Sequence, residues 1–316
     1  MPPDSLIALD DATTADAIAA PDAAVVIGNF DGVHRGHQAV LAETVGYAKA
    51  HGLAPVVLTF DPHPAAVVGA GGPPVLTTLA RRAELAAELG VARVYARRFD
   101  SAFAAWPPDR FVRELLVATV RAKRVSVGEN FRFASKRTGD LTTLRALGAE
   151  LGFDVHVQEL ARDAGGAFSS SRARACVEAG DVVGAAEVLG RPHAICGTVA
   201  HGAKRGRTIG FPTANVEAIP EIVPANGVYA VRVDRLEGGA RGWAGVTNIG
   251  VRPTVGGDPK RSVEVFLLDW DGDLYGAELR VHFVARLRAE KKFGGLDELK
   301  AQIARDVDAA RAILAA

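Results

Sequence analysis

Cysteine is almost absent from this chain, whose 316 residues include only Cys176 and Cys196. Two thiols are too few for a disulfide framework or a cysteine-based zinc site. An excess of one charge is also missing, because 37 lysines and arginines balance 37 aspartates and glutamates, so no global field attracts nucleic acid or a membrane. No apolar run reaches the length of a membrane span, and the acidic, alanine-rich start does not resemble a secretion signal. These absences predict a cytoplasmic protein.

The length of the chain predicts two domains, because single hydrophobic cores stop growing at about 250–300 residues. Up to Gly190, expected strands alternate with expected helices, which is typical of a doubly wound parallel α/β sheet. Beyond Pro192, short strands of period two are separated by turn signals, which favours a small antiparallel β-barrel. We therefore predict domains at residues 1–190 and 191–316, the second ending in a helix.

Apolar periodicity and glycine or proline stops set the expected boundaries. In the first domain the expected strands cover residues 23–27, 55–60, 91–95, 124–127 and 154–157. The expected helices there cover residues 38–50, 81–89, 110–122, 142–151 and 182–189, with one more that stops at Gly180. In the second domain the expected strands cover residues 196–199, 227–233, 242–247, 263–270 and 279–287, and the final helix covers residues 296–316.

A glycine-rich turn joins the first expected strand to the first expected helix and reads G-N-F-D-G-V-H-R-G-H over residues 28–37. Glycines let the backbone approach a ligand closely, and a helix N-terminus favours an anion. Two imidazoles beside that terminus can donate to phosphate oxygens, although a histidine pair standing alone is more often a packing feature. The turn indicates a nucleotide site, and its candidate residues are Gly28, Asn29, Phe30, Asp31, Gly32, His34 and His37.

Three further segments of the first domain carry polar residues where ligands bind. T-F-D-P-H-P, residues 59–64, follows an expected strand, and ligands of open α/β sheets lie at such strand ends. G-E-N-F-R-F and K-R-T-G-D, within residues 128–140, follow another strand. S-S-S-R-A-R, residues 169–174, begins a helix. Its serines alone are ordinary helix caps.

The second domain contains a loop rich in glycine and cations, G-A-K-R-G-R-T-I-G-F-P-T-A-N over residues 202–215. Its amides and cations can wrap phosphates, but the G-K-[ST] order of a Walker A loop is missing, and spacing alone favours a mobile basic hairpin. Glu264 lies within the otherwise apolar expected strand 263–270, where an isolated carboxylate usually faces solvent.

Together these segments resemble the bacterial bifunctional riboflavin kinase/FAD synthetases. G-N-F-D-G-V-H-R-G-H resembles the nucleotidylyltransferase signature, and G-x-x-x-G-R-x-x-G-F-P-T-A-N is a specific match to riboflavin kinases. D-L-Y-G at residues 273–276 and R-A-E-K-K-F at residues 288–293 extend the match over nearly the whole chain. The resemblance implies a kinase that converts riboflavin to FMN and an adenylyltransferase that converts FMN to FAD, both using ATP with Mg²⁺.

The resemblance also implies roles for residues of the first domain. His34, His37 and Arg174 would stabilise charge during adenylyl transfer. Ser170 and Ser171 would close over the triphosphate. Asn130 would contact the adenine, the ribose or the flavin phosphate, and the sequence does not separate these.

In the second domain the resemblance implies that Glu264 is the kinase base. Thr213 and Asn215 would hold Mg²⁺ and nucleotide through neutral oxygens, which suit that ion. The nucleotide and flavin site of the kinase would also include Gly202, Lys204, Gly206, Arg207 and Gly210.

Four residues depart from the family pattern. Ala134 replaces a usual glycine, Ser171 replaces threonine, Ala173 replaces isoleucine, and Phe266 stands where histidine is common. Ala134, Ser171 and Phe266 leave open a flavin-binding or sensing module with one inactive site. H-x-G-H also marks class I aminoacyl-tRNA synthetases, but the zero net charge, the short chain and the missing K-M-S-K-S loop oppose that class.

The expected partners are the small molecules riboflavin, FMN, FAD and ATP, with no nucleic acid and no membrane. The oligomeric state stays open, a weak homo-oligomer included.

Overall fold

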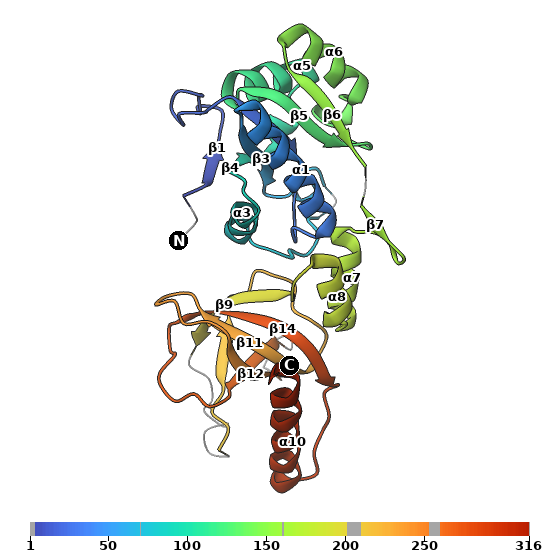
Figure 1. Cartoon of the computed structure of the whole chain (residues 1–316). Coiled ribbons are helices and arrows are strands. Elements are labelled where there is room, and N and C mark those ends of the chain that lie inside the picture. Colours follow the sequence, from blue (N-terminus) through green and yellow to red (C-terminus); the bar gives the residue numbers. More distant parts are fainter. Residues whose placement is uncertain (1–3, 70, 160, 201–209, 253–259, 316) are drawn as a thin grey trace. The chain divides into compact units, whose positions relative to one another are not determined.

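The computed structural model describes residues 4–69, 71–159, 161–200, 210–252 and 260–315. The chain divides into two compact units with separate hydrophobic cores (Figure 1). The first unit comprises Met1–Pro74 and Thr78–Ser169, and the second comprises Val75–Thr77 and Ser170–Ala316. The two compact units are therefore divided after Ser169. The boundary between the two predicted functional domains, at residues 190 and 191, stays a prediction.

A six-stranded sheet forms the centre of the first unit. Its order is β1-β4-β3-β2-β5-β6, and every neighbouring pair is parallel, as the sequence predicts. The edge strand β1 is not among the predicted strands. The six strands are β1 (Leu6–Leu9), β2 (Ala23–Ile27), β3 (Ala54–Asp61), β4 (Arg93–Arg98), β5 (Ala122–Gly128) and β6 (Asp154–Gln158).

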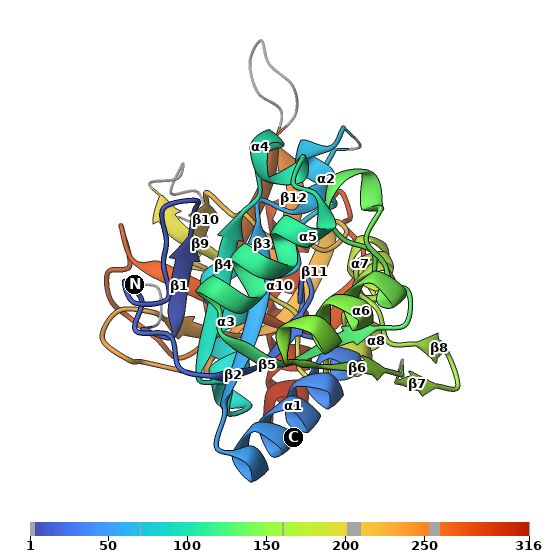
Figure 2. The same ribbon diagram turned by 90° about the horizontal axis from the view of Figure 1, so that it is seen from above.

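Helices cover both faces of this sheet (Figure 2) because its central strand is apolar on both sides. Val25 and Ile27 of β2 belong to the core that includes η1 and α6, whereas Val26 belongs to the core that includes α1 and α3. The helices are α1 (Arg35–His51), α2 (Pro64–Val67), α3 (Leu79–Glu88), α4 (Ser101–Ala104), α5 (Pro108–Arg110), the π-helix η1 (Phe111–Thr119), the 3₁₀ turn η2 (Ser135–Arg137) and α6 (Leu141–Leu151). A small hairpin, β7 (Arg162–Asp163) and β8 (Gly166–Ala167), follows β6 and is not predicted.

One predicted helix is too long. The sequence favours a helix through Ala122, but η1 ends at Thr119. Arg121 has a φ of 57°, and Ala122 already pairs with Ala23 in the sheet. No glycine or proline separates the helix from the strand, so the sequence carries no stop signal at this point.

The strand order places the ligand-binding edge of the sheet. The chain runs outward from β2 through β3 to β4 and then returns to β5 on the other side of β2. Ligands of open α/β sheets bind at the carboxyl ends of the strands, where this reversal occurs. The turns that follow β2, β3 and β5 are therefore the relevant ones, and they hold three of the four segments identified from sequence.

The second unit is built on a closed six-stranded antiparallel barrel of order β10-β13-β12-β11-β14-β9 (Figure 1). The sequence predicts five of these strands and treats the sixth, β10, as part of the glycine-rich loop. The strands are β9 (Ala194–Ala200), β10 (Ala214–Glu217), β11 (Gly227–Arg235), β12 (Trp243–Arg252), β13 (Lys260–Leu267) and β14 (Glu278–Arg288), and the last helix is α10 (Leu296–Ala315).

The predicted strand 263–270 lies three residues further along the chain than the observed strand β13. The observed β13 begins at Lys260 and ends at Leu267. Asp269 has a φ of 54°, a left-handed conformation that is incompatible with an extended strand. Leu268 continues the apolar run past the end of the strand, so the sequence pattern favours a strand that ends later than the observed one.

Residues of β13 alternate between two cores. Val263, Val265 and Leu267 point into the barrel. Phe266, on the outer face, packs instead in the cluster that α10 covers. Glu264 shares this outer face by the same period, so it points away from the barrel interior but toward the side that the last helix covers.

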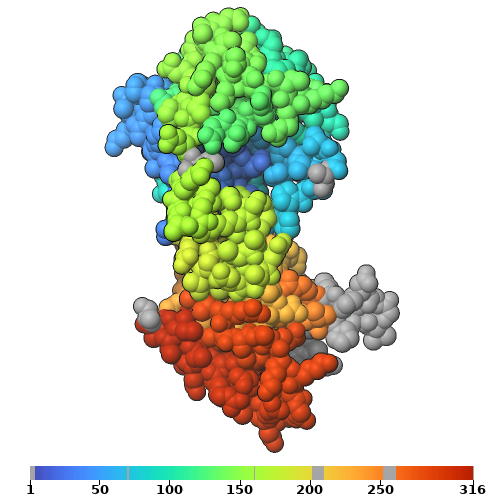
Figure 3. All heavy atoms as spheres, turned by 90° about the vertical axis from the view of Figure 1, so that its right-hand side faces the viewer, coloured from blue at the N-terminus to red at the C-terminus, as the bar shows by residue number. Residues whose placement is uncertain are grey.

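Two helices precede the barrel and pack with it. They are α7 (Ser170–Ala179) and α8 (Val182–Leu189). Val182 belongs to the barrel core, and in Figure 3 the yellow-green atoms of this region adjoin the orange and red atoms of the barrel. Val75 also pairs with Glu221 through an isolated parallel bridge, and the Ile222 amide donates to the Val75 carbonyl at 2.7 Å.

Candidate active sites

The turn after β2 holds a strained backbone. Phe30 and Val33 have φ values of 50° and 40°, and Gly32 lies between them at 84°. Left-handed conformations are unfavourable for bulky side chains and persist only where the surroundings impose them. Here both side chains are buried in the core beneath α1 and α3, at 4% and 1% exposure. Burial therefore holds the turn in a shape that its backbone alone would not adopt.

His34 and His37 lie together at the start of α1. Their rings stack with centroids 3.6 Å apart and planes 21° apart. His34 caps the helix, because its Nδ1 accepts a hydrogen bond from the His37 amide at 3.3 Å. A neutral His34 therefore carries its proton on Nε2 and can donate from there. A Cβ at Gly36 would lie 3.1 Å from the His34 ring, so glycine permits this packing.

Two residues outside the signature, Arg82 and Thr59, support the turn. Arg82 of α3 lies 3.4 Å from Asp31, and both side chains are buried. Arg82 also donates to the Asn29 carbonyl at 3.2 Å, and the Thr59 hydroxyl donates to the same oxygen at 3.1 Å. The predicted role of Asp31 in binding nucleotide stays a prediction, but its carboxylate is placed to order the turn. Arg82 was not identified from sequence, since an arginine on an amphipathic helix normally reads as a surface residue.

The segment after β3 adjoins the signature, as the sheet topology requires. The Asn29 side-chain nitrogen lies 2.9 Å from His63 Nε2, a hydrogen-bond distance. His63 also caps α2 by accepting the Ala65 amide at 3.1 Å. T-F-D-P-H-P and G-N-F-D-G therefore form one surface at the carboxyl edge of the sheet.

The segment after β5 forms a tight, closed loop. Asn130 lies in the exposed turn directly after the strand. Phe133 and Gly139 exchange two backbone hydrogen bonds of 3.1 Å, and a Cβ at Gly139 would lie 2.7 Å from the Phe133 ring. Ala134 has a φ of 63° and a ψ of −169°, a region that is otherwise confined to glycine. The replacement of glycine at this position therefore leaves the loop closed but strained.

Ser170, Ser171 and Arg174 lie in the first turns of α7. This helix belongs to the second compact unit, whereas the two histidines belong to the first. Their predicted action on one phosphate chain stays a prediction.

In the barrel, Thr213, Asn215 and Glu264 are brought together on one face. Asn215 and Glu264 are direct partners in the β10–β13 register, and directly opposed residues of an antiparallel pair share a face. The Thr213 hydroxyl lies 3.4 Å from a Glu264 carboxylate oxygen. Gly210 is exposed with a φ of 89°. Gly202, Lys204, Gly206 and Arg207 lie outside the described residues.

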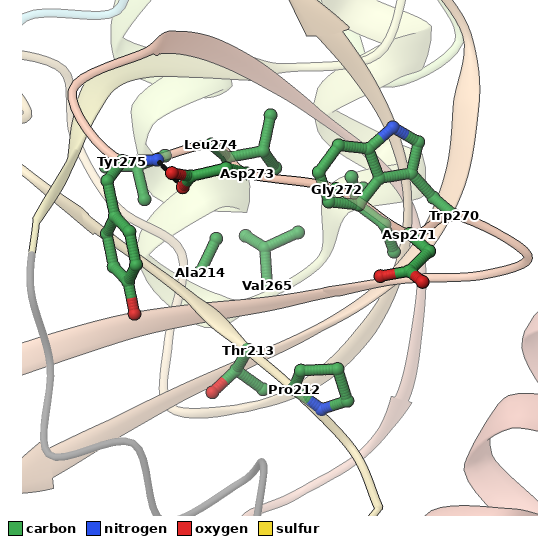
Figure 4. A pocket seen from close by; sticks show the side chains of 12 residues that line it. Pro212, Thr213, Ala214, Val265, Trp270, Asp271, Gly272, Asp273, Leu274 and Tyr275 are labelled. Atoms are coloured by element: carbon green, nitrogen blue, oxygen red, sulfur yellow. Dashed lines mark hydrogen bonds between the residues drawn. The ribbon is translucent and has the colours of Figure 1, made fainter.

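Two cavities share Thr213 as a lining residue. One, of about 340 Å³, is lined by Ala214 and Val265 and flanked by Trp270 and Tyr275 (Figure 4). We call it the Trp270 cavity. The other, of about 360 Å³, lies between the outer face of the barrel and α10, and we call it the Glu264 cavity. Its walls include the aromatic rings Phe211, Phe266 and Phe293, the aliphatic residues Leu299 and Ile303 of α10, and the polar residues Asn248 and Glu264.

A buried ion pair fixes the α10 wall of the Glu264 cavity. Asp306 of α10 is 5% exposed. Arg288, at the end of β14, donates to both of its carboxylate oxygens at 2.8–3.1 Å, and Gln302 adds a hydrogen bond of 2.9 Å. A bidentate pair of this kind restricts geometry as well as adding energy. The cavity wall is therefore tied to the barrel.

The two units define the class of the protein. The first has a strained glycine turn, a helix N-terminus and stacked histidines at the carboxyl edge of a parallel sheet, an arrangement that suits the binding of phosphate groups. The second places the Glu264 carboxylate 3.4 Å from the hydroxyl of Thr213, a residue that lines two cavities, which suits transfer of a group from one bound molecule to another. The chain combines two nucleotide-dependent transferases.

Family models narrow this class. The model described as FAD synthetase matches residues 17–172, and the model described as riboflavin kinase matches residues 189–314. The chain is 43% identical over 288 residues to the bifunctional riboflavin kinase/FMN adenylyltransferase of Escherichia coli (strain K12), covering 91% of each protein. It is 42% identical to the protein of that description from Pseudomonas fluorescens, covering 92% of each. The chain belongs to the bifunctional riboflavin kinase/FMN adenylyltransferase family, with the FAD synthetase part first and the riboflavin kinase part second.

A solved structure shares the whole architecture. The crystal structure described as a macrolide-efflux protein from Streptococcus pneumoniae matches 97% of this chain and 99% of its own, with a TM-score of 0.85 and 29% identity. Among the described residues of the present chain, no helix has the length and apolar character needed to cross a membrane.

The strained loop yields a test of stability. Ala134→Gly should relieve a backbone strain of about 1–3 kcal/mol. The added freedom of glycine in the unfolded chain costs about 0.5–1 kcal/mol. The net expectation is a gain of about 1 kcal/mol in the free energy of unfolding, measured by urea titration.

Ala105→Gly is the matched control, because Ala105 has an ordinary φ of −88°. That variant should be less stable than the parent protein. If Ala134→Gly is destabilised to the same extent as Ala105→Gly, the loop is not strained at Ala134.

Proposed function

We propose that the barrel transfers the γ-phosphoryl group of ATP to the 5′-hydroxyl of riboflavin. We further propose that the α/β domain then joins the FMN product to the AMP part of a second ATP, giving FAD and pyrophosphate. The observation that carries the first step is the position of Thr213, which lines both cavities and reaches Glu264. Donor and acceptor bound in adjoining cavities would meet at this residue.

Riboflavin is assigned to the Glu264 cavity. The flat, largely apolar flavin ring fits a space bounded by Phe211, Phe266 and Phe293. Glu264 lies on the wall of the same space, so it is placed to accept the proton of the hydroxyl that becomes phosphorylated. Phe266 packs edge-on against Phe211 with centroids 5.5 Å apart, so the replacement of histidine there extends the apolar wall.

ATP of the kinase is assigned to the Trp270 cavity. Trp270 and Tyr275 offer aromatic surfaces to a nucleobase on either side of the space (Figure 4). Pro212 and Thr213 at its edge continue into the glycine-rich loop, whose cations suit a triphosphate.

The donor set at Thr213 and Asn215 fits Mg²⁺. The two side chains supply neutral oxygens near the Glu264 carboxylate, and Mg²⁺ binds hard oxygens while taking further ligands from phosphate and water. Bound there with ATP, the ion would neutralise charge on the phosphates. The protein's own contribution is to position the hydroxyl and to accept its proton.

The adenylyl transfer needs no strong base, because the attacking FMN phosphate is already an anion. Positioning and charge stabilisation are what the site must supply. His34 Nε2 and His37 would donate to the reacting phosphates at the start of α1, and Arg174 would add a bidentate contact. The turn residues Gly28 to Gly32 would hold the nucleotide, and Ser170, Ser171 and Asn130 would complete the site.

The two activities should be physically separable at the proposed boundary. Residues 191–316 expressed alone should convert riboflavin to FMN and stop there, measured by chromatography of the products. A fragment of residues 170–316 keeps Val182 in the barrel core and should be the more stable of the two. If both fragments are folded yet neither phosphorylates riboflavin, the assignment of the kinase to the barrel fails.

His37→Ala should reduce FAD formation from FMN by on the order of a hundredfold, because a donor to the developing charge is removed. FMN formation from riboflavin should continue at the parental rate. The matched control is His51→Ala, an exposed histidine at the other end of α1, which should leave both rates unchanged. Equal losses of both activities in His37→Ala would contradict a role in adenylyl transfer.

Glu264→Gln keeps the shape of the side chain but removes the proton acceptor, so riboflavin phosphorylation should fall by roughly 10² or more. Supplied FMN should still become FAD at the normal rate. Glu217→Gln makes the same chemical change at an exposed position of β10 and should alter neither rate. Near-normal kinase turnover in Glu264→Gln would exclude Glu264 as the base.

A further inference from the structure

Asn248 is the partner of Glu264 on the neighbouring strand. In the β12–β13 register the two residues are directly opposed, just as Asn215 opposes Glu264 from β10 on the other side. Opposed residues share a face and have Cβ atoms about 4.5–5.5 Å apart. Asn248 and Glu264 both line the Glu264 cavity. The motifs identified from sequence do not include Asn248.

The Asn248 carboxamide makes no hydrogen bond with any group in the parts of the chain that the structure describes. It is half-buried and stands in a cavity whose walls combine aromatic and aliphatic side chains with polar and charged ones, Glu290 and Lys291 among them. Asn226, on the same barrel, differs. Its carboxamide donates to Glu290 and accepts from Arg261, both at 3.2 Å. When a ligand displaces the water around such a polar group, binding free energy is lost unless the ligand itself forms a hydrogen bond with the group.

We propose that Asn248 binds the inner hydroxyl groups of the ribityl chain of riboflavin. This inference rests on the proposed kinase function of the barrel. With the terminal hydroxyl at Glu264, the ribityl chain would run across the sheet toward β12, and the hydroxyls that precede the reacting one would lie beside Asn248. A carboxamide both donates and accepts, so it can pair with a hydroxyl in either sense.

The consequence is substrate selection by the ribityl chain. A site built to hydrogen-bond a hydroxyl rejects an analogue that lacks it, because the protein group is left desolvated and unpaired. Asn248 would thus distinguish riboflavin from flavins with a plain alkyl chain, whereas the aromatic walls would accept both.

The test combines two substrates with two variants of the full-length chain. The second substrate is a flavin with a 5-hydroxypentyl group in place of ribityl, which keeps the reacting hydroxyl and lacks the inner ones. We expect the parent enzyme to prefer riboflavin by roughly 10²-fold or more in kcat/KM. Asn248→Ala should lower kcat/KM for riboflavin roughly tenfold or more while changing it little for the analogue, so the preference shrinks.

Asn226→Ala is the matched control, because protein groups already satisfy that carboxamide. It should keep the parental preference, even if both rates change together. An unchanged preference in Asn248→Ala would overturn the inference. If Asn248→Ala does not fold, Asn248→Asp, which keeps the size and removes the donor, replaces it in the same comparison. Failure of the parent enzyme to phosphorylate riboflavin would instead refute the proposed function of the barrel.

Discussion

The hydrogen-bonded register of three barrel strands decides which polar side chains share the outer face of the barrel. Pairing of β10 with β13 and of β13 with β12 aligns Asn215, Glu264 and Asn248 on one face. A shift of β13 by one residue would turn Glu264 toward the barrel interior, where Val263 and Val265 now pack. The apolar alternation that builds the core thus also orders the polar row, and the aromatic and α10 walls of the cavity then enclose it.

The α/β unit uses a different constraint for the same purpose. Its signature turn is held by the burial of Phe30 and Val33 in unfavourable backbone conformations and by the Arg82–Asp31 pair beneath. The favourable burial of these side chains offsets the cost of the strained backbone, and it thereby fixes the positions of the backbone amides and the two imidazoles. Rigid support of this kind suits a reaction that depends on positioning more than on proton transfer.

Much of this architecture could be predicted from sequence, for physical reasons. Strand β2 is uniformly apolar, β3 has an apolar centre, and α6 and α8 end at glycines, so period and stop signals agree. The prediction failed where such signals were absent, at the end of η1 before Arg121 and at the end of β13. The sequence does not predict β10 because this strand is only four residues long and its first two residues belong to a motif that is typical of a loop. Asn248 and Arg82 could not be found from sequence, since their significance lies in strand register and in a distant ion pair.

The membership of Val75–Thr77 in the second unit has a consequence for how the chain is made. Leu76 is fully buried in the finished protein, and Val75 bonds to residues 221 and 222. During synthesis this segment leaves the ribosome long before its partners exist, because proteins emerge from their N-terminus. The first unit can complete its sheet early, but this apolar segment must wait, exposed, until the barrel has been translated. The barrel must therefore be translated before this segment can be buried, and until then the segment is open to aggregation and to proteolysis.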